Sequence, residues 1–345
     1  MLTKGKHTPF LVYMRDIWYD HFADIVAFVK KRENPFAERD GNNMKAGLLL
    51  EGGAMRGLFS AGVMDVFMEN GVQFDGLMGV SAGAVFGCNY KSGQIGRTIR
   101  YNMRFCKDKR YCSLKNLVLT GDLYGADFCY HVLPRELDVF DREAFERHPM
   151  HFYVLCTDAE TGESVVHDCL HCDDRDLEWM RGSASMPLAS KPVEIDGYKL
   201  LDGGITESIP LRRFENMGYE KNVVILTQPR AYVKKPNKLM PLIQRALKKY
   251  PRTVEAIRRR HVNYNAERAY ALRREHTGDA LLIFPDAPLE IGYTCHDANE
   301  MKRVYELGRQ MGEKRLKDVR DFLQNKEKDA DKRIRENIKK GLVSN

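Results

Sequence analysis

A serine stands between two glycines near residue 80, in the run Gly79-Val80-Ser81-Ala82-Gly83. An apolar, strand-like segment beginning near Phe74 precedes it, and a helix-like segment follows. Glycines on both sides permit a sharp strand-to-helix turn, which leaves the hydroxyl exposed above a sheet with a helix N-terminus behind it. The pattern is typical of a nucleophilic serine, although ordinary Gly-Ser loops carry it too.

A glycine-rich turn lies upstream, between an apolar run over 46–51 and a helical pattern over 58–70. The turn reads Gly52-Gly53-Ala54-Met55-Arg56-Gly57, an arrangement that can direct backbone N–H groups at an anion. Neither phosphate-binding fingerprint fits, because no Gly-Lys-Ser/Thr closes the turn and Ala54 replaces the second glycine of G-x-G-x-x-G. Two interpretations of the turn therefore remain: an oxyanion hole, and a strand-to-helix connection with no catalytic role.

An aspartate ends another short apolar strand in the run Tyr198-Lys-Leu-Leu-Asp202-Gly203-Gly204. Asp196-Gly197 just before it predicts a hairpin turn. The two glycines after Asp202 let the chain turn away while the carboxylate stays at the tip of the strand. By itself, Asp-Gly-Gly would indicate only a loop.

Together, these three segments resemble the patatin-like phospholipases, a family of serine acyl hydrolases. The family has a glycine-rich oxyanion loop, a G-x-S-x-G serine and a D-G-G or D-G-A aspartate in this chain order. The segment 181–187, Arg-Gly-Ser-Ala-Ser-Met-Pro, resembles the stretch that the family places shortly before its aspartate. The resemblance spans roughly residues 46–230 and implies a three-layer α/β/α sandwich.

The resemblance implies a Ser-Asp dyad in which Ser81 attacks an ester carbonyl and Asp202 accepts its proton. It assigns the oxyanion hole to the turn, with N–H donors at residues 52–55 and a structural or charge-stabilising Arg56. The turn is made of Gly52, Gly53, Ala54, Met55, Arg56 and Gly57, and the supporting glycines are Gly79, Gly83, Gly203 and Gly204. Ala54 departs from the family's third glycine, which would cost about 1 kcal/mol if the position needs a positive φ.

A Ser-His-Asp triad is the alternative, because His276 and His296 follow Asp202 in the chain order of an α/β-hydrolase. Two further function classes compete. One is a non-catalytic lipid or acyl-binding protein on the same scaffold, for which Ala54 is the only support. The other is a nucleotide-binding oxidoreductase, which lacks the acidic ribose partner that such a fold needs. No cofactor and no metal are expected.

Eight scattered cysteines are unlike a disulfide-stapled secreted domain. The run His167-Asp-Cys169-Leu-His171-Cys172 contains a C-x-x-C that could form half of a zinc site or a redox pair. No second ligand pair stands nearby, so free thiols are the simpler interpretation. The sequence shows no signal peptide and no apolar run long enough to span a membrane. We therefore expect a cytoplasmic protein, and we keep peripheral contact with a membrane surface as an alternative.

The net charge of +7 is concentrated in residues 244–275, which have a helical pattern. Such a basic region beside a lipase core suggests attraction to anionic lipid headgroups, with a solvated helix face as the plain alternative. No recognition motif or aromatic platform supports a nucleic-acid partner. The expected substrate is a lipid or another acyl ester, and the sequence specifies no oligomeric state.

Strands that alternate with helices predict an α/β fold with a mostly parallel sheet, plus a basic helical cap or C-terminal layer. Residues 1–45 read as an extension with an amphipathic helix over 10–30 and a polar linker over 33–43, and 46–230 as the catalytic core. Residues 231–325 read as the basic helices with the last strand and helix, and 326–345 as a fraying charged tail. The further expected strands are 151–157, 163–167, 222–228 and 280–285, and the further expected helices are 96–107 and 299–322.

Overall fold

The computed structural model describes residues 44–341, with side chains described for residues 44–324. The helix expected over 10–30 and the linker expected over 33–43 lie outside this range. The described residues belong to one compact unit.

The core of the unit is an eight-stranded sheet in the order β5-β6-β3-β2-β1-β7-β8, with β4 paired to β3. The five strands β3, β2, β1, β7 and β8 run parallel, whereas β4, β5 and β6 pair antiparallel. The sheet is therefore mostly parallel, as predicted. The strands are β1 (Lys45–Leu50), β2 (Gly76–Val80), β3 (His151–Asp158), β4 (Ser164–Asp168), β5 (Val193–Ile195), β6 (Tyr198–Asp202), β7 (Tyr219–Ile225) and β8 (Ala280–Ile283).

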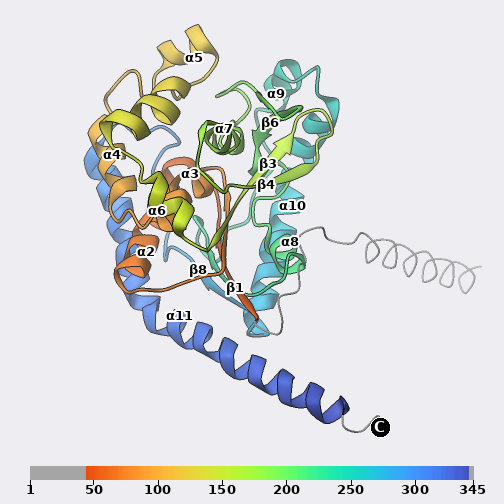
Figure 1. Ribbon diagram of the computed structural model, residues 1–345. Coiled ribbons are helices and arrows are strands. Elements are labelled where there is room, and N and C mark those ends of the chain that lie inside the picture. The colour runs from red at the N-terminus through yellow and green to blue at the C-terminus, as the bar shows by residue number, and fades with distance from the viewer. Residues whose placement is uncertain (1–43, 342–345) are drawn as a thin grey trace, which may run out of the picture. The chain divides into compact units, whose positions relative to one another are not determined.

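Helices cover both faces of the sheet, which gives the predicted three layers (Figure 1). Leu48 and Leu50 of β1 point to one face, where they join a core built with α2 (Gly57–Glu69), α3 (Ala82–Lys91), α4 (Arg97–Phe105) and α11 (Ala298–Gly341). Leu49 points to the other face, toward α8 (Leu211–Asn216) and α10 (Pro251–His276). Strands buried on both faces read as continuous apolar runs, which is why 46–50 was recognisable as a strand.

Several short helices that line the unit were not predicted from the sequence. They are α5 (Leu114–Thr120), α6 (Arg142–Arg147), α7 (Asp174–Ser183), α9 (Met240–Ala246), the π-helix η2 (Phe128–Leu137) and the 3₁₀ turns η1 (Ala54–Arg56) and η3 (Gly203–Ile205). Most span fewer than three turns, so their apolar residues show no clear period.

The C-terminal helix is longer than predicted. α11 continues to Gly341, through residues 326–340 where the charged sequence was expected to fray. Glu, Lys, Arg and Ala are all good helix formers, which accounts for a helix through this charged segment. No helix among the described residues is long and apolar enough to cross a bilayer.

The basic segment 244–275 forms the layer on the second face rather than a free helix. Arg268 of α10 is buried and donates to the carbonyls of Pro229 and Arg230. Arg274 pairs with Glu215 at 2.7 Å. Part of the positive charge that suggested a membrane surface is therefore used inside the fold, while most of the basic side chains of this segment are exposed.

Candidate active site

Ser81 stands at a strained turn between β2 and α3. Its backbone angles, φ 56° and ψ −122°, lie outside the regions that a residue with a Cβ normally adopts. Its N–H donates to Ser183 Oγ at 2.8 Å, and Ser183 in turn donates to the Leu155 carbonyl at 2.7 Å. The stretch 181–187 was noted in the sequence, but its part in holding this turn was not foreseen.

Asp202 is brought to Ser81 by the pairing of β3. One edge of β3 pairs first with β2, Leu155 with Val80, and then with β6, Cys156 with Asp202. Ser81 follows Val80, so the serine and the aspartate meet where β2 ends and β6 begins to pair. The Ser81 hydroxyl lies near the Asp202 carboxylate and lowers its pKa through a side-chain hydrogen-bond interaction. The same carboxylate accepts the Gly204 N–H at 2.8 Å and is only 4% exposed.

Burial raises the pKa of the Asp202 carboxyl above its usual value, against the lowering effects of Arg260, the Ser81 hydroxyl, the Gly204 N–H and Lys234. Arg260 of α10 also donates to the Gly204 carbonyl, which fixes it beside the carboxylate. Burial together with the charge of Arg260 lowers the pKa of Lys234 to about 8. A buried base with a raised pKa is typical of functional sites. No local sequence signal pointed to Arg260 or Lys234.

The glycine-rich turn lies directly against Ser81. A Cβ added at Gly52 would stand 2.7 Å from the Cβ of Ser81, so only glycine fits there. Glu51 anchors the start of the turn, because its carboxylate accepts Thr227 N–H and the Tyr264 hydroxyl, each at 2.6 Å. Ala54 has φ 48°, the positive value at which a methyl group is unfavourable.

Not every N–H of the turn is free to bind an anion. The N–H of Arg56 donates to the Gly53 carbonyl at 3.1 Å, and that of Gly57 donates to the carbonyls of Ala54 and Met55. The Arg56 guanidinium lies over the ring of Tyr293, 5.5 Å from its centroid. The N–H groups of the turn that could stabilise an oxyanion are therefore those that precede Arg56.

The supporting glycines allow the three motifs to pack closely. A Cβ at Gly83 would lie 2.4 Å from the Leu50 carbonyl oxygen, and one at Gly203 would lie 2.1 Å from that of Leu155. A Cβ at Gly79 would lie 2.5 Å from Ala84 Cα. The structure thus brings together all three motifs identified in the sequence.

A cavity of about 160 Å³ opens beside Ser81. Ala54, Met55 and Ser81 line one part of it, and the rest is mostly apolar, with Tyr101, Leu133 and Phe140 in its wall. The walls come from α3 and α4, which the sequence predicted, and from η2 and α7, which it did not. A largely apolar cavity with a few polar groups at one side is typical of a site for a ligand with a hydrocarbon part.

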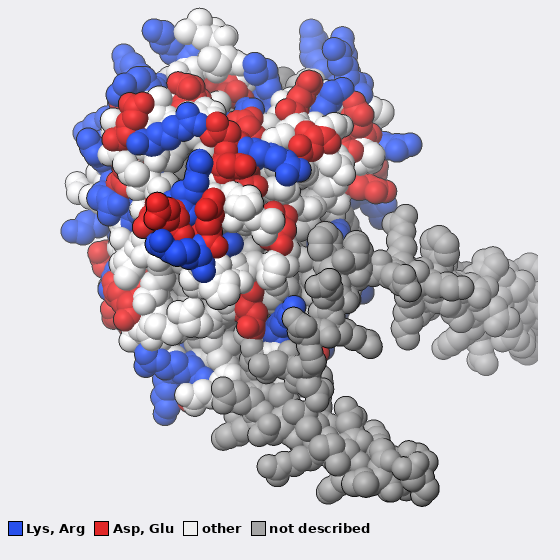
Figure 2. Space-filling model, in the orientation of Figure 1, with Lys and Arg blue, Asp and Glu red and all other residues white. Residues whose placement is uncertain are grey.

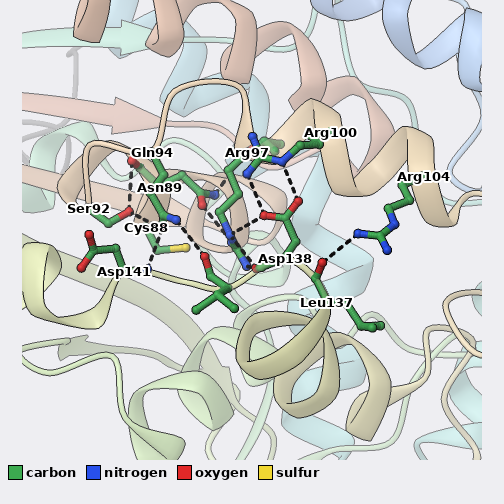
Figure 3. Close-up of polar contacts among 12 residues, drawn as sticks. Cys88, Asn89, Ser92, Gln94, Arg97, Arg100, Arg104, Leu137, Asp138 and Asp141 are labelled. Carbon is green, nitrogen blue, oxygen red and sulfur yellow. Dashed lines mark hydrogen bonds and ion pairs between the residues drawn. The ribbon is translucent and has the colours of Figure 1, made fainter.

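Arg97, at the start of α4, contributes a buried charge to the wall of the cavity, and Figure 3 shows its polar contacts. It donates to the Asn89 amide oxygen at 2.9 Å and to the Asp138 carbonyl at 2.6 and 3.1 Å, and it pairs with the Asp138 carboxylate at 3.3 Å. Arg100 forms two further bonds to this carboxylate, both of 2.7 Å. Removing one partner of such a buried pair typically costs about 3–5 kcal/mol.

The two histidines considered for a triad have other environments. His296 bonds the Cys106 carbonyl at 2.6 Å through Nδ1, and His276 is an exposed residue in the last turn of α10. The groups that act on Asp202 are those named above, and no histidine is among them. The geometry of the described residues therefore favours a two-residue arrangement over a triad.

The cysteine–histidine run forms a tight loop before α7. His167, Cys169 and Asp176 place one ligand atom each within 4.8 Å of the others. The Asp176 carboxylate is already hydrogen-bonded by His167 at 2.7 Å and by the N–H groups of His171 and Cys172 at 3.0 and 2.8 Å. Cys172 faces the cavity instead. Hydrogen bonding of the loop accounts for this cluster, and no metal is assigned to it.

Among solved structures, the chain resembles VipD from Legionella pneumophila and the ExoU–SpcU complex of Pseudomonas aeruginosa. VipD is 13% identical with a TM-score of 0.36, covering 79% of this chain and 67% of its own. The ExoU–SpcU match is 14% identical with a TM-score of 0.34, covering 80% and 53%.

Curated relatives match about half of this chain. The uncharacterized protein YjjU of Escherichia coli is 28% identical over 205 residues, covering 56% of this chain and 55% of its own. The uncharacterized NTE family protein Rv1063c of Mycobacterium tuberculosis is 24% identical over 187 residues, covering 54% and 50%. Neuropathy target esterase sws of Drosophila melanogaster is 27% identical over 187 residues, covering 52% and 12%. The chain thus spans about half the length of the two bacterial relatives and a smaller part of the third.

Two family models match separate parts of the chain. Residues 250–324 match a domain of unknown function, DUF6363, and this segment supplies α10, β8 and the first part of α11. Residues 48–214 match the patatin-like phospholipase model and contain all three motifs of the site. Through residues 48–214, the chain belongs to the patatin-like phospholipase family.

Proposed function

We propose that this protein is a serine acyl-ester hydrolase that acts on lipid esters. The observation that carries the proposal is the strained Ser81, which lies beside the buried Asp202 and lines a largely apolar cavity. The matches to the patatin-like phospholipase family and to a named esterase support the reaction class.

In the proposed reaction, Ser81 Oγ attacks the ester carbonyl carbon while its proton passes to the Asp202 carboxylate. The carbonyl oxygen becomes an oxyanion, which the N–H groups of residues 52–55 would stabilise. The intermediate then collapses, and the alcohol leaves with the proton from Asp202. Water attacks the resulting acyl-serine and gives its proton to Asp202, and the carboxylic acid is released as Ser81 regains its hydrogen.

The raised pKa of Asp202 suits this role, because a base of higher pKa accepts a proton from a hydroxyl more readily. The hydrogen bond from Gly204 holds the carboxylate in orientation, and Gly52 of the glycine-rich turn lies against the serine. The acyl chain would occupy the cavity lined by Tyr101 and Leu133.

The test uses acyl nitrophenyl esters and a fluorophosphonate probe on the full chain. Ser81→Ala and Asp202→Asn should each reduce kcat/KM by at least about 10³-fold without lowering the melting temperature by more than a few degrees. Ser92→Ala, a buried serine just beyond α3, is the matched control and should leave turnover unchanged. Undiminished turnover in either site variant would contradict the dyad.

A second candidate is a non-catalytic acyl-binding protein, favoured by one observation, the methyl group of Ala54 at φ 48°. The probe separates the two functions. Labelling at Ser81 requires an activated hydroxyl and supports the hydrolase. Folded wild-type protein that binds fatty acid but takes no label supports the binder instead.

A further inference from the structure

The short helix α5 exposes three large apolar side chains. Leu114, Val118 and Leu119 are 75%, 83% and 70% exposed, and no residue of α5 is buried. Leu114 and Val118, four residues apart, lie on one side of the helix, and Leu119 extends the exposed apolar surface around it. These three residues are called the α5 tip below. Isolated exposed apolar residues are common, but a cluster of this kind marks a contact with another surface.

The α5 tip is held at the rim of the cavity. Cys112 and Tyr124 on either side of α5 form an antiparallel bridge, and Ser113 N–H donates to the Leu123 carbonyl at 3.0 Å. Leu123 N–H in turn donates to the Ala189 carbonyl at 2.8 Å. Tyr111, Asp122 and Tyr124 from the same segment line the cavity. α5 is therefore a fixed projection beside the cavity that Ser81 faces.

Basic side chains surround the α5 tip. Residues 107–121 carry four basic side chains, Lys107, Lys109, Arg110 and Lys115, and one acidic one, Asp108. Asp108 pairs with Arg110 at 2.7 Å, so no acidic side chain of the segment is left to neutralise the three lysines. Figure 2 shows uncharged surface at the top of the molecule, over α5, with basic side chains on both sides.

A second projection of the same character flanks the site. Residues 231–249, which include α9, carry six basic side chains and no acidic one, and all six except the half-buried Lys234 of the candidate site are exposed. Val233, Leu239 and Leu242 are 66%, 52% and 57% exposed there. Ile243 and Leu247 of this segment pack with Leu201 and Ile205, the neighbours of Asp202 in the chain. In Figure 1, α5 and α9 lie at the same end of the described unit.

We infer that α5 and residues 231–249 together form a docking surface for an anionic lipid bilayer. Apolar side chains on two projections can enter the acyl region while the lysines and arginines around them bind lipid phosphates. A bilayer is an extended surface, so it can engage both projections at once. The role of this docking rests on the proposed function, because docking would turn the cavity beside Ser81 toward the lipid esters of the bilayer.

The first experiment is vesicle sedimentation with the full chain carrying Ser81→Ala, so that no lipid is consumed. Vesicles are made of phosphatidylcholine alone or mixed with phosphatidylglycerol. Replacing the α5 tip by Leu114→Ser, Val118→Ser and Leu119→Ser should weaken binding to the mixed vesicles about tenfold or more. The matched control is Val139→Ser, an apolar residue that is 60% exposed in the loop before α6, and its binding should be unchanged.

The charge contribution is tested by Lys109→Glu with Lys115→Glu. Binding to the mixed vesicles should fall about tenfold and lose most of its dependence on salt, while binding to phosphatidylcholine alone should change little. Lys302→Glu with Lys317→Glu changes the net charge of the chain equally, but on the exposed side of α11, and should bind like the parent.

The outcomes separate this inference from the proposed function. Turnover of a soluble nitrophenyl ester by the α5-tip variant with Ser81 restored should equal that of wild type, because the tip does not contact Ser81. Vesicle binding without any esterase activity would contradict the hydrolase but support the docking surface. Undiminished vesicle binding by the tip variant would overturn the docking surface, and a dimer that the variant converts to monomer would assign the tip to self-association.

Discussion

Gly52 and Ser81 are in such close contact that a Cβ on residue 52 would lie 2.7 Å from the serine Cβ and 2.8 Å from the Val80 carbonyl oxygen. Gly52→Ala should therefore displace the turn or the serine, and a shift of about 1 Å at reacting groups can cost about 10²-fold in rate. Ester turnover measures the effect. Gly292→Ala is the control, because its nearest neighbour would be 3.4 Å away, and activity equal to wild type in both variants would contradict the contact.

Ala54→Gly should stabilise the protein by about 1 kcal/mol, because Ala54 has φ 48° and glycine adopts this conformation without the penalty of a methyl group. Urea denaturation followed by circular dichroism gives the free energy of unfolding. The control, Ala266→Gly, lies at an exposed position inside α10 and should instead destabilise by about 1 kcal/mol. Destabilisation by both variants would show that the turn does not strain the alanine.

The acid limb of the pH–activity profile should report Asp202. The proposed base works only as the carboxylate, so kcat/KM should fall as the pH drops through a pKa that burial raises above the usual value. The variants His276→Ala and His296→Ala should retain the whole profile. If either histidine variant lost turnover or the acid limb of its pH profile, a Ser-His-Asp triad would be favoured over the dyad.

Arg260→Gln should move this acid limb to higher pH. The Arg260 charge opposes the effect of burial on the pKa of Asp202, so removing it should raise that pKa further. The activity of the variant would then be lower than that of wild type on the acid side and closer to it at higher pH. Arg259→Gln removes an exposed neighbouring charge and should leave the limb in place.

Glu267→Gln should stabilise the protein above neutral pH. Burial raises the pKa of Glu267 from 4.5 to about 7, so the folded state binds a proton that the unfolded state has already released between these values. Stability from this group is complete below the unfolded pKa of 4.5 and is lost as the pH rises through 7. One oxygen accepts both the Ser208 and Ile209 N–H groups, at 3.0 and 2.9 Å, and a glutamine oxygen can do the same.

The melting temperature of Glu267→Gln should therefore exceed that of wild type at pH 8, by the equivalent of about 2 kcal/mol, and the gain should vanish near pH 4. Glu255→Gln, an exposed position on α10, is the control and should show no such pH dependence. A gain that is the same at both pH values would mean that ionisation of Glu267 is not its cause.

The parallel core and the three motifs were predictable because their signals are local. An apolar run such as 46–50 is buried on both faces and therefore reads as a strand, and glycines mark the points where Ser81 and Asp202 leave their strands. The antiparallel pair β3–β4 was also visible, since Glu160-Thr-Gly162 separates two strand-like runs. Distances between the motifs could not be predicted, because they depend on the strand order.

The surroundings of the site were not predictable, because their contacts join residues far apart in the chain. Arg260 reaches Gly204 across 56 positions, and Ser183 reaches the N–H of Ser81 across 102. The basic composition of 244–275 suggested a membrane surface, yet Arg268 and Arg274 are used within the fold. α5 had no amphipathic pattern to reveal it, since every one of its apolar residues is exposed or half-buried.

The arginine network around Asp138 has a consequence for what the cavity can accommodate. Soft apolar side chains in the wall of a cavity can switch rotamer and make room for a larger guest. Arg97 cannot retreat in this way, because any movement would break its bonds to Asn89 and Asp138 and strand a charge away from water. Electrostatics, rather than steric bulk, therefore keeps this part of the cavity wall in place, and a guest has to fit the wall as it stands.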